Sequence, residues 1–125
     1  MYKTILVERQ IEDGFKLLRA LDERGFPTEA ALWYQDPDKM TWKLRLASSL
    51  ESRPGPDPYF LIASAMEGLD LSFSLNDIRL MNPQSREFRE FRRYMEGVVG
   101  SAGIRPKDPS KGTAFDDAYI YRWLD

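Results

Sequence analysis

Three arginines on one predicted helix have the residue type and spacing that phosphate binding requires. Within residues 86–99, Arg86, Arg89 and Arg93 recur at intervals of three and four, so at about 100° per residue they fall within roughly 60° of one another. Each guanidinium carries a planar fork of donors that matches phosphate oxygens. We call these residues the arginine ridge, and their spacing indicates a nucleic-acid-binding face. Glu90, within one turn of two of them, favours the alternative of a solvated helix face with internal ion pairs.

The predicted hairpin of residues 30–48 carries the next candidate surface. Its strand-like segments, 30–35 and 41–48, flank the sequence Asp-Pro-Asp, whose residue types favour turns. A five-residue loop places Trp33 on the outer face beside Lys43, whereas a four-residue loop turns Trp33 into the core. We expect the five-residue loop, because it brings the two larger apolar sets together.

In the expected register, Trp33 shares the outer face with Lys43 and Arg45. An aromatic ring among cations is typical of surfaces on which the bases of single-stranded nucleic acid stack. Two other arrangements are compatible with the same side chains. The face could form a protein interface, or another helix could cover it while the basic groups reach past that helix to water.

The sequence contains neither histidine nor cysteine, which excludes several kinds of site. Without them no disulfide, thiolate metal site, Ser-His-Asp triad or zinc-histidine site can form. Asp36 and Asp38 are explained by turn chemistry, so we predict no metal site and no cofactor. The loop at 100–113 lacks the spacing of a phosphate-binding loop. A net charge of -2 argues against general attraction to nucleic acid or anionic membranes.

The closing segment of the chain combines aromatic residues with the alternation of a strand. Tyr119, Tyr121 and Trp123 alternate with aliphatic and basic residues, and aromatic residues favour strands. Tyrosine and tryptophan are also enriched at interfaces, because each joins a large apolar area to a polar end. We expect these three side chains to belong to the core, with contact in a homodimer as the alternative.

Two other helices are expected to hold these surfaces in place. Residues 8–24 show apolar positions at helical spacing, with Gly25 suited to a left-handed cap and Gly14 suited to close approach of a strand. Asp57 is typical of an N-cap and Pro58 of a first helical position. The residues that follow, YFLIASAMEG, are apolar on nearly every side. A helix of that kind is buried, either in the core or in a subunit interface.

A strand at 75–81 and a helix at 86–99 capped by Ser85 complete the predicted order of helix, strand, strand, helix, strand, helix, strand. This order favours an α+β fold, a single domain over residues 1–125 with three helices and a mostly antiparallel sheet of about four strands. The length of 125 residues is typical of one domain.

The absence of a catalytic constellation and the aromatic closing strand favour a non-catalytic accessory module. We expect it to act in the cytosol through protein-protein contacts, including self-association as a homodimer. The alternative is a nucleic-acid-binding adaptor that uses the arginine ridge. No segment approaches the ~20 apolar residues of a membrane span, so no membrane partner is expected. The two hypotheses differ in whether the ridge and the outer hairpin face are exposed and adjoin each other.

Overall fold

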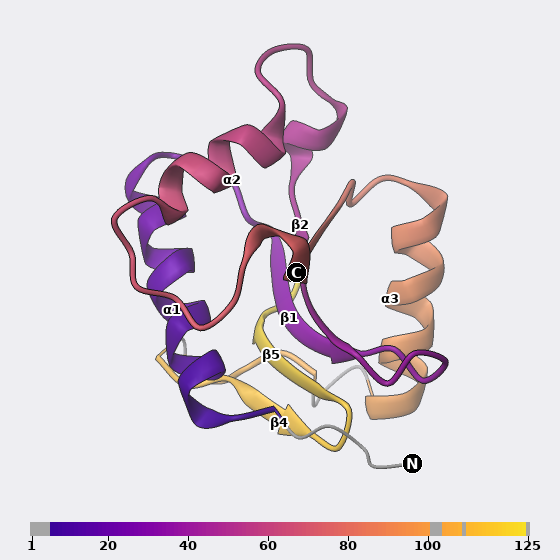
Figure 1. Ribbon diagram of the computed structural model, residues 1–125. Coiled ribbons are helices and arrows are strands. Elements are labelled where there is room, and N and C mark those ends of the chain that lie inside the picture. Colours follow the sequence, from indigo (N-terminus) through magenta and orange to yellow (C-terminus); the bar gives the residue numbers. More distant parts are fainter. Residues whose placement is uncertain (1–5, 101–103, 109, 125) are drawn as a thin grey trace.

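The computed structural model describes residues 6–100, 104–108 and 110–124. A mixed sheet forms its centre, with helices on both faces (Figure 1). The α-helices of these residues are α1 (Glu8–Glu23), α2 (Pro58–Met66) and α3 (Arg86–Val99). The strands and short 3-10 helices are β1 (Ala30–Gln35), β2 (Trp42–Ala47), η1 (Ser49–Ser52), η2 (Leu75–Asp77), β3 (Ile78–Met81), β4 (Thr113–Phe115) and β5 (Ala118–Arg122). None of the helices in this part of the chain is both long and apolar enough to cross a membrane.

The strands lie in the order β3-β2-β1-β5-β4. β2 and β3 are parallel, and the other neighbouring pairs are antiparallel. The parallel pair forms because the chain between these strands returns through α2, the kind of crossover that parallel neighbours require. The predicted α+β class with a mostly antiparallel sheet is confirmed. Over the described residues the sheet has five strands, where about four were expected.

The additional strand is β4, which begins where the predicted loop of 100–113 ends. Its three residues pair with β5 across a turn at Asp116 and Asp117. So short a strand has too few residues for its alternation to be recognised, which is why the sequence indicated only a loop. Residues 101–103 and 109 of that loop lie outside the described residues.

The helices divide between the two faces of the sheet. α1 and α2 cover one face and α3 covers the other (Figure 1). All six residues of β1 are buried, as expected of a central strand that is covered on both sides. Two apolar clusters result, one including Leu17 and Trp33 on the face of α1 and α2, the other including Leu32 and Phe88 on the face of α3.

The hairpin register differs from the expected one. Trp33 pairs with Leu44, which leaves six residues, 36–41, between β1 and β2. Trp33 is 0% exposed and packs on the face of α1 and α2. The side chains of Lys43 and Arg45 belong to the opposite face, because neighbours along a strand alternate. The expected position of Trp33 on an outer face with these two cations is therefore wrong.

Two physical features explain this register. Leu32 and Tyr34 are buried as well as Trp33, so the apolar pattern of β1 does not distinguish its faces. In addition, the indole Nε1 of Trp33 donates a hydrogen bond of 2.9 Å to the Tyr121 hydroxyl. This hydrogen bond stabilises a buried indole, and only the inward register provides it.

The aromatic residues of the closing segment belong to the core. Tyr121 is 3% exposed and Trp123 is 6% exposed, while Tyr119 is half-buried. The Tyr121 hydroxyl also donates to the carbonyl oxygen of Ile11 in α1, at 2.7 Å. A Cβ atom added at Gly14 would lie 2.0 Å from that hydroxyl, so the predicted close approach of a strand to Gly14 is confirmed. Tyr121 and Trp123 leave too little exposed area to serve as an interface.

The predicted helix ends are also confirmed. Gly25 has a φ of +73° after the end of α1. The Asp57 carboxylate accepts from the backbone N–H of Tyr59 at 3.0 Å and so caps α2. The Ser85 hydroxyl accepts from the backbone N–H of Phe88 at 3.1 Å and caps α3. These caps fix the positions at which α2 and α3 begin, beside the edge of the sheet formed by β3.

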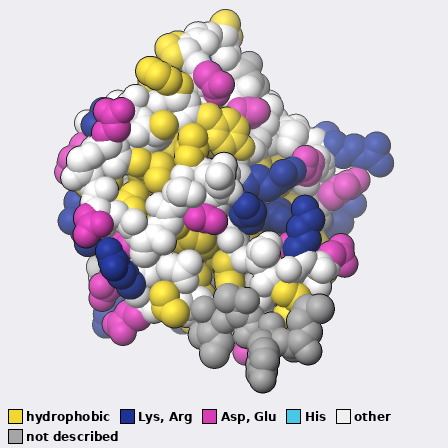
Figure 2. Space-filling view, viewed as in Figure 1, with side chains coloured by type: hydrophobic (Ala, Val, Ile, Leu, Met, Phe, Trp, Pro, Cys, Tyr) yellow, Lys and Arg dark blue, Asp and Glu magenta, His cyan; other side chains and the backbone are white. Residues whose placement is uncertain are grey.

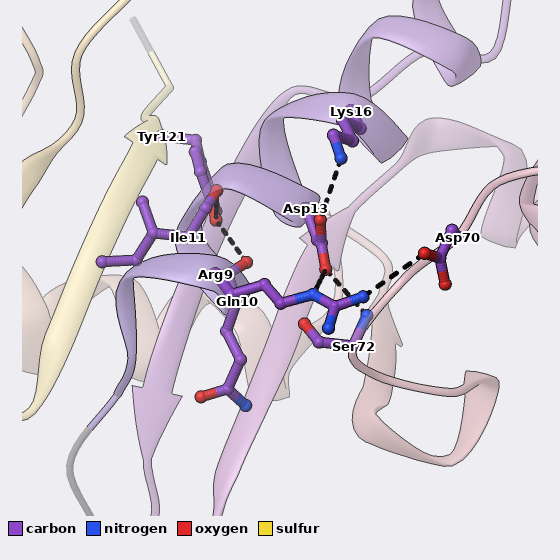
Figure 3. A network of polar contacts seen from close by, with 8 residues as sticks. All are labelled: Arg9, Gln10, Ile11, Asp13, Lys16, Asp70, Ser72 and Tyr121. Carbon is purple, nitrogen blue, oxygen red and sulfur yellow. Dashed lines mark hydrogen bonds and ion pairs between the residues drawn. The ribbon is translucent and has the colours of Figure 1, made fainter.

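A buried carboxylate ties α1 to the loop between α2 and η2 (Figure 3). Asp13 is 1% exposed, and its carboxylate accepts from the backbone N–H of Ser72 at 2.7 Å. Arg9 and Lys16 approach the same carboxylate at 3.6 and 3.4 Å, and Arg9 also contacts Asp70. Burial by itself raises the pKa of Asp13, but the hydrogen bonds from Ser72 and the contact with Lys16 together outweigh it and lower the pKa. The network holds the chain that leads from α2 into β3.

Candidate functional site

A groove of about 480 Å³ opens at the edge of the sheet beside β2 and β3. It is bounded by the hairpin loop, the two strands, and the first residues of α2, η2 and α3. We call it the β2 groove. Its lining residues are Tyr34, Asp36, Lys39, Thr41, Lys43, Arg45, Tyr59, Asn76, Ile78, Arg79 and Glu87. In the view of Figure 2, lysine and arginine side chains gather on the right of the molecule, towards α3, with acidic side chains among them.

Arg45 is the central cation of the β2 groove. Its Cζ atom lies 4.8 Å from the ring centroid of Tyr34 and 4.4 Å from that of Phe91, distances typical of cation-π contacts. Within the described residues, no hydrogen bond or ion pair reaches its guanidinium, and the buried Nε has no partner. Burial, and then repulsion from Arg79, lower the pKa of Arg45, although an arginine stays protonated at neutral pH. Arg45 is thus a half-buried cation with no ion-pair partner among the described residues, although the carboxylates of Asp36 and Glu87 attract it from beyond ion-pair distance.

Tyr34 does not supply the missing negative charge. Burial raises its pKa to about 12, and the neighbouring Tyr94 contributes to the shift. Tyr34 is therefore a neutral phenol at physiological pH. Its ring offers Arg45 the negative face of a π system and no full charge.

The register of β2 and β3 adds a second cation next to Arg45. These strands pair in parallel with Arg45 opposite Arg79, so both side chains leave the same face of neighbouring strands. Like charges in that position destabilise a sheet. Arg79 is partly compensated by an ion pair with Glu87 at the start of α3. The repulsion between the two arginines is relieved by any anion that lies between them.

Two lysines complete the positive lining. The Nζ atom of Lys43 donates to the carbonyl oxygen of Asn76 at 2.6 Å, which holds its charge at the groove. Lys39 is exposed on the hairpin loop. That loop is fixed by Asp36, whose carboxylate accepts from the backbone N–H groups of Asp38 and Lys39 at 2.8 and 3.3 Å. These hydrogen bonds lower the pKa of Asp36, so it remains charged.

The charge of the groove is opposite in sign to that of the whole chain. Four cations and two carboxylates, all among the described residues, line it and give a formal charge of +2, against -2 for the sequence. Of the pairs formed within this set, Arg79 with Glu87 is the one at ion-pair distance. The arrangement is suited to binding an anion. The described residues contain no group of three or more acidic side chains placed to hold a metal.

The arginine ridge is exposed but separate from the β2 groove. Arg86, Arg89 and Arg93 are all exposed, and the Nε of Arg86 pairs with Glu90 at 3.0 Å. The groove is bordered on α3 by Glu87. At about 100° per residue, Arg89 lies roughly 160° around the helix from Glu87. The structure therefore brings Lys43 and Arg45 together in the groove, and none of the three ridge arginines is among its lining residues.

Sequence reasoning missed Lys39 and Arg79 as members of this site. A signal for Arg79 was present, since it alternates with the apolar Ile78 and Leu80 in the predicted strand. Its partner was not predictable, because the parallel pairing of β3 with β2 depends on the path of the chain through α2. The site is thus created by a pairing between residues far apart in the sequence.

A second candidate surface is apolar and centres on α2. Phe60 is 67% exposed, and only Ile62 and Ala65 of this helix are buried. Beside Phe60, an apolar cleft of about 340 Å³ is lined by Leu21, Arg24, Gly25, Phe26, Leu50, Leu61 and Ser64. We call Phe60 and this cleft the α2 surface. Figure 2 shows hydrophobic side chains running down the middle of the face on which α2 lies. The predicted burial of an all-round apolar helix is thus incomplete within one chain.

The comparisons with known proteins provide no further guide. The chain matches no family model, no curated protein and no solved structure. The β2 groove, the α2 surface and the arginine ridge are therefore the features that bear on its function.

Proposed function

We propose that this protein is a non-catalytic binding module that acts through protein-protein contacts, with a second copy of the chain as its partner. The exposure of Phe60, 67% on an otherwise apolar helix, is the observation that supports the proposal. Burial of an aromatic side chain removes roughly 150–250 Å² of surface from water, and such residues dominate interface energetics. A cytosolic location is part of the same proposal, and cell fractionation tests it.

The α2 surface contains both halves of a self-complementary contact. Phe60 is a protruding ring, and the neighbouring cleft is lined by apolar side chains that include Leu21 and Phe26. In a two-fold dimer each surface patch meets itself, so the ring of one copy enters the cleft of the other. A central aromatic anchor in an apolar pocket is the usual energetic centre of an interface.

Sedimentation velocity between about 1 and 100 µM measures the dimer directly. We expect the wild type to dimerise in this range and Phe60→Ser to weaken the dimer by at least about tenfold, since an aromatic anchor contributes that much or more. Val98→Ser is the matched control, because Val98 is 65% exposed on α3, away from α2, and should leave the dimer unchanged. A wild type that stays monomeric to about 100 µM contradicts the proposal. So does an equal loss in both variants.

A second candidate function is that of a nucleic-acid-binding adaptor, and the exposure of all three ridge arginines favours it. Fluorescence anisotropy with a labelled single-stranded RNA and a labelled DNA duplex tests it at about 50 mM salt. We expect binding that weakens with added salt, and a smaller salt slope after Arg86, Arg89 and Arg93 are all changed to alanine. Absence of binding to both probes at this salt concentration rules the adaptor out.

A further inference from the structure

The β2 groove has a feature that protein-protein contact at α2 does not explain. Arg45 is half-buried and, within the described residues, meets two aromatic rings and no acceptor. Burial of a charge is unfavourable unless the charge is paired and hydrogen-bonded. The cross-strand neighbour Arg79 adds repulsion to this cost. Two neighbouring arginines in one groove create a positive potential that suits an anion.

The remaining lining groups supply further donors at fixed positions. Lys43 is held by the carbonyl oxygen of Asn76 at 2.6 Å. The Tyr59 hydroxyl accepts from the backbone N–H of Leu80 at 2.9 Å, which orients it and leaves its own proton for another acceptor. Charged donors and a neutral donor from separate elements therefore converge on one groove. The anchoring contacts reduce the ordering cost of binding.

The dimensions and charge of the groove restrict the ligand. A volume of about 480 Å³ falls within the roughly 300–1,000 Å³ of small-molecule sites. The formal charge of +2 is balanced by a dianion, and a phosphate monoester carries about -1.5 to -2 at neutral pH with three acceptor oxygens. Asp36 and Glu87 border the groove and oppose a continuous polyanion, which would have to pass beside these carboxylates.

We propose that the β2 groove binds a small phosphate monoester, with Arg45 and Arg79 as its main phosphate ligands and Lys43 and Tyr59 as supporting donors. The planar donor fork of a guanidinium matches two oxygens of one phosphate group, so bidentate contacts are available. The rings beside Arg45 limit its movement. The site meets α2 at Tyr59, but its two arginines lie on β2 and β3, so it does not depend on dimer formation.

Isothermal titration calorimetry with phenyl phosphate, inorganic phosphate and succinate tests the site and distinguishes phosphate from carboxylate chemistry. We expect phenyl phosphate to bind one per chain, inorganic phosphate to bind more weakly, and succinate to bind least. Arg45→Met retains an unbranched stem against the rings and removes the fork, so binding should weaken about 10- to 100-fold. Arg79→Met should also weaken binding. Because Arg79 is exposed, this substitution is less able to disturb the fold than Arg45→Met.

Arg89→Met is the matched control, because it removes one arginine from the exposed ridge while leaving the groove intact. Its affinity for phenyl phosphate should stay within about twofold of the wild type, since a distant surface charge is screened by salt. Phe60→Ser should also bind normally, which separates this site from the proposed dimer. Three results overturn the site: no heat from either phosphate probe at about 10 mM, succinate binding as tightly as phenyl phosphate, or an equal loss in the Arg45 and Arg89 variants.

Discussion

At the scale of single residues, close contact with a distant strand leaves room only for glycine at position 14. This position lies inside α1, where glycine is unfavourable relative to alanine by up to ~1 kcal/mol. A Cβ atom at this position would lie 2.0 Å from the Tyr121 hydroxyl oxygen and 2.5 Å from its ring carbon. We therefore expect Gly14→Ala to lower the free energy of unfolding by about 1–3 kcal/mol, because overpacking outweighs the gain in helix propensity. Urea denaturation measures the change.

Gly97 in α3 provides the comparison that isolates this cause. A Cβ atom added there meets nothing within 4 Å, so Gly97→Ala should raise the free energy of unfolding by up to ~1 kcal/mol. The two substitutions are chemically identical and are expected to differ in sign. If both stabilise the chain, the close contact between Gly14 and Tyr121 is not present in solution.

At the scale of elements, the Asp13 carboxylate connects α1 with the loop that leads to β3. The buried carboxylate accepts from Ser72 and contacts Lys16, and its pKa is lowered. A lowered pKa contributes stability that is present above the unfolded pKa, near 3.9, and is lost as pH falls through the folded pKa. Asp13→Asn should therefore lower the free energy of unfolding by about 1–3 kcal/mol at pH 7. This difference should shrink below about pH 4.

Urea denaturation at pH 7 and at about pH 3 measures both parts of this prediction. Glu12→Gln is the control, because Glu12 is an exposed carboxylate on the same helix and its loss should change stability by less than about 0.5 kcal/mol. A difference between wild type and Asp13→Asn that is the same at both pH values would show that the charge of Asp13 contributes nothing, and that its hydrogen bond alone matters.

The elements also show what the sequence could and could not predict. Local signals sufficed for the helix ends at Gly25 and Ser85, because caps depend on neighbouring residues. The hairpin register failed for a different reason. Leu32, Trp33 and Tyr34 are all buried, so alternation could not tell which face Trp33 occupies. The groove was beyond prediction from local sequence, because it requires Arg79 to pair beside β2 through a crossover.

At the scale of the whole molecule, the net charge of the chain is opposite in sign to the charge of the β2 groove. The chain carries -2, while the lining of the β2 groove carries +2 among the described residues. The excess of acid must lie elsewhere on the surface. A small dianion is thus attracted to one groove of a protein that repels polyanions overall, and this attraction decreases as salt is added.

The same groove sets a balance between stability and binding for the whole fold. Desolvation and repulsion from Arg79 destabilise the charged Arg45, and attraction from Asp36 and Glu87 opposes them. The cation-π contacts offset about 0.5–2 kcal/mol of the cost. A buried charge without an ion-pair partner carries a desolvation cost, and an apolar side chain of similar length removes that cost. We therefore expect Arg45→Met to leave the melting temperature unchanged or to raise it, whereas Arg89→Met changes the free energy of unfolding by less than about 0.5 kcal/mol. Thermal denaturation measures both variants.

Adding phenyl phosphate should raise the melting temperature of the wild type and of Arg89→Met but not of Arg45→Met, because only a chain that binds the ligand gains stability from it. If Arg45→Met instead loses more than about 1 kcal/mol without ligand, Arg45 already has a stabilising partner within the protein, and the groove does not need an anion to balance its charge.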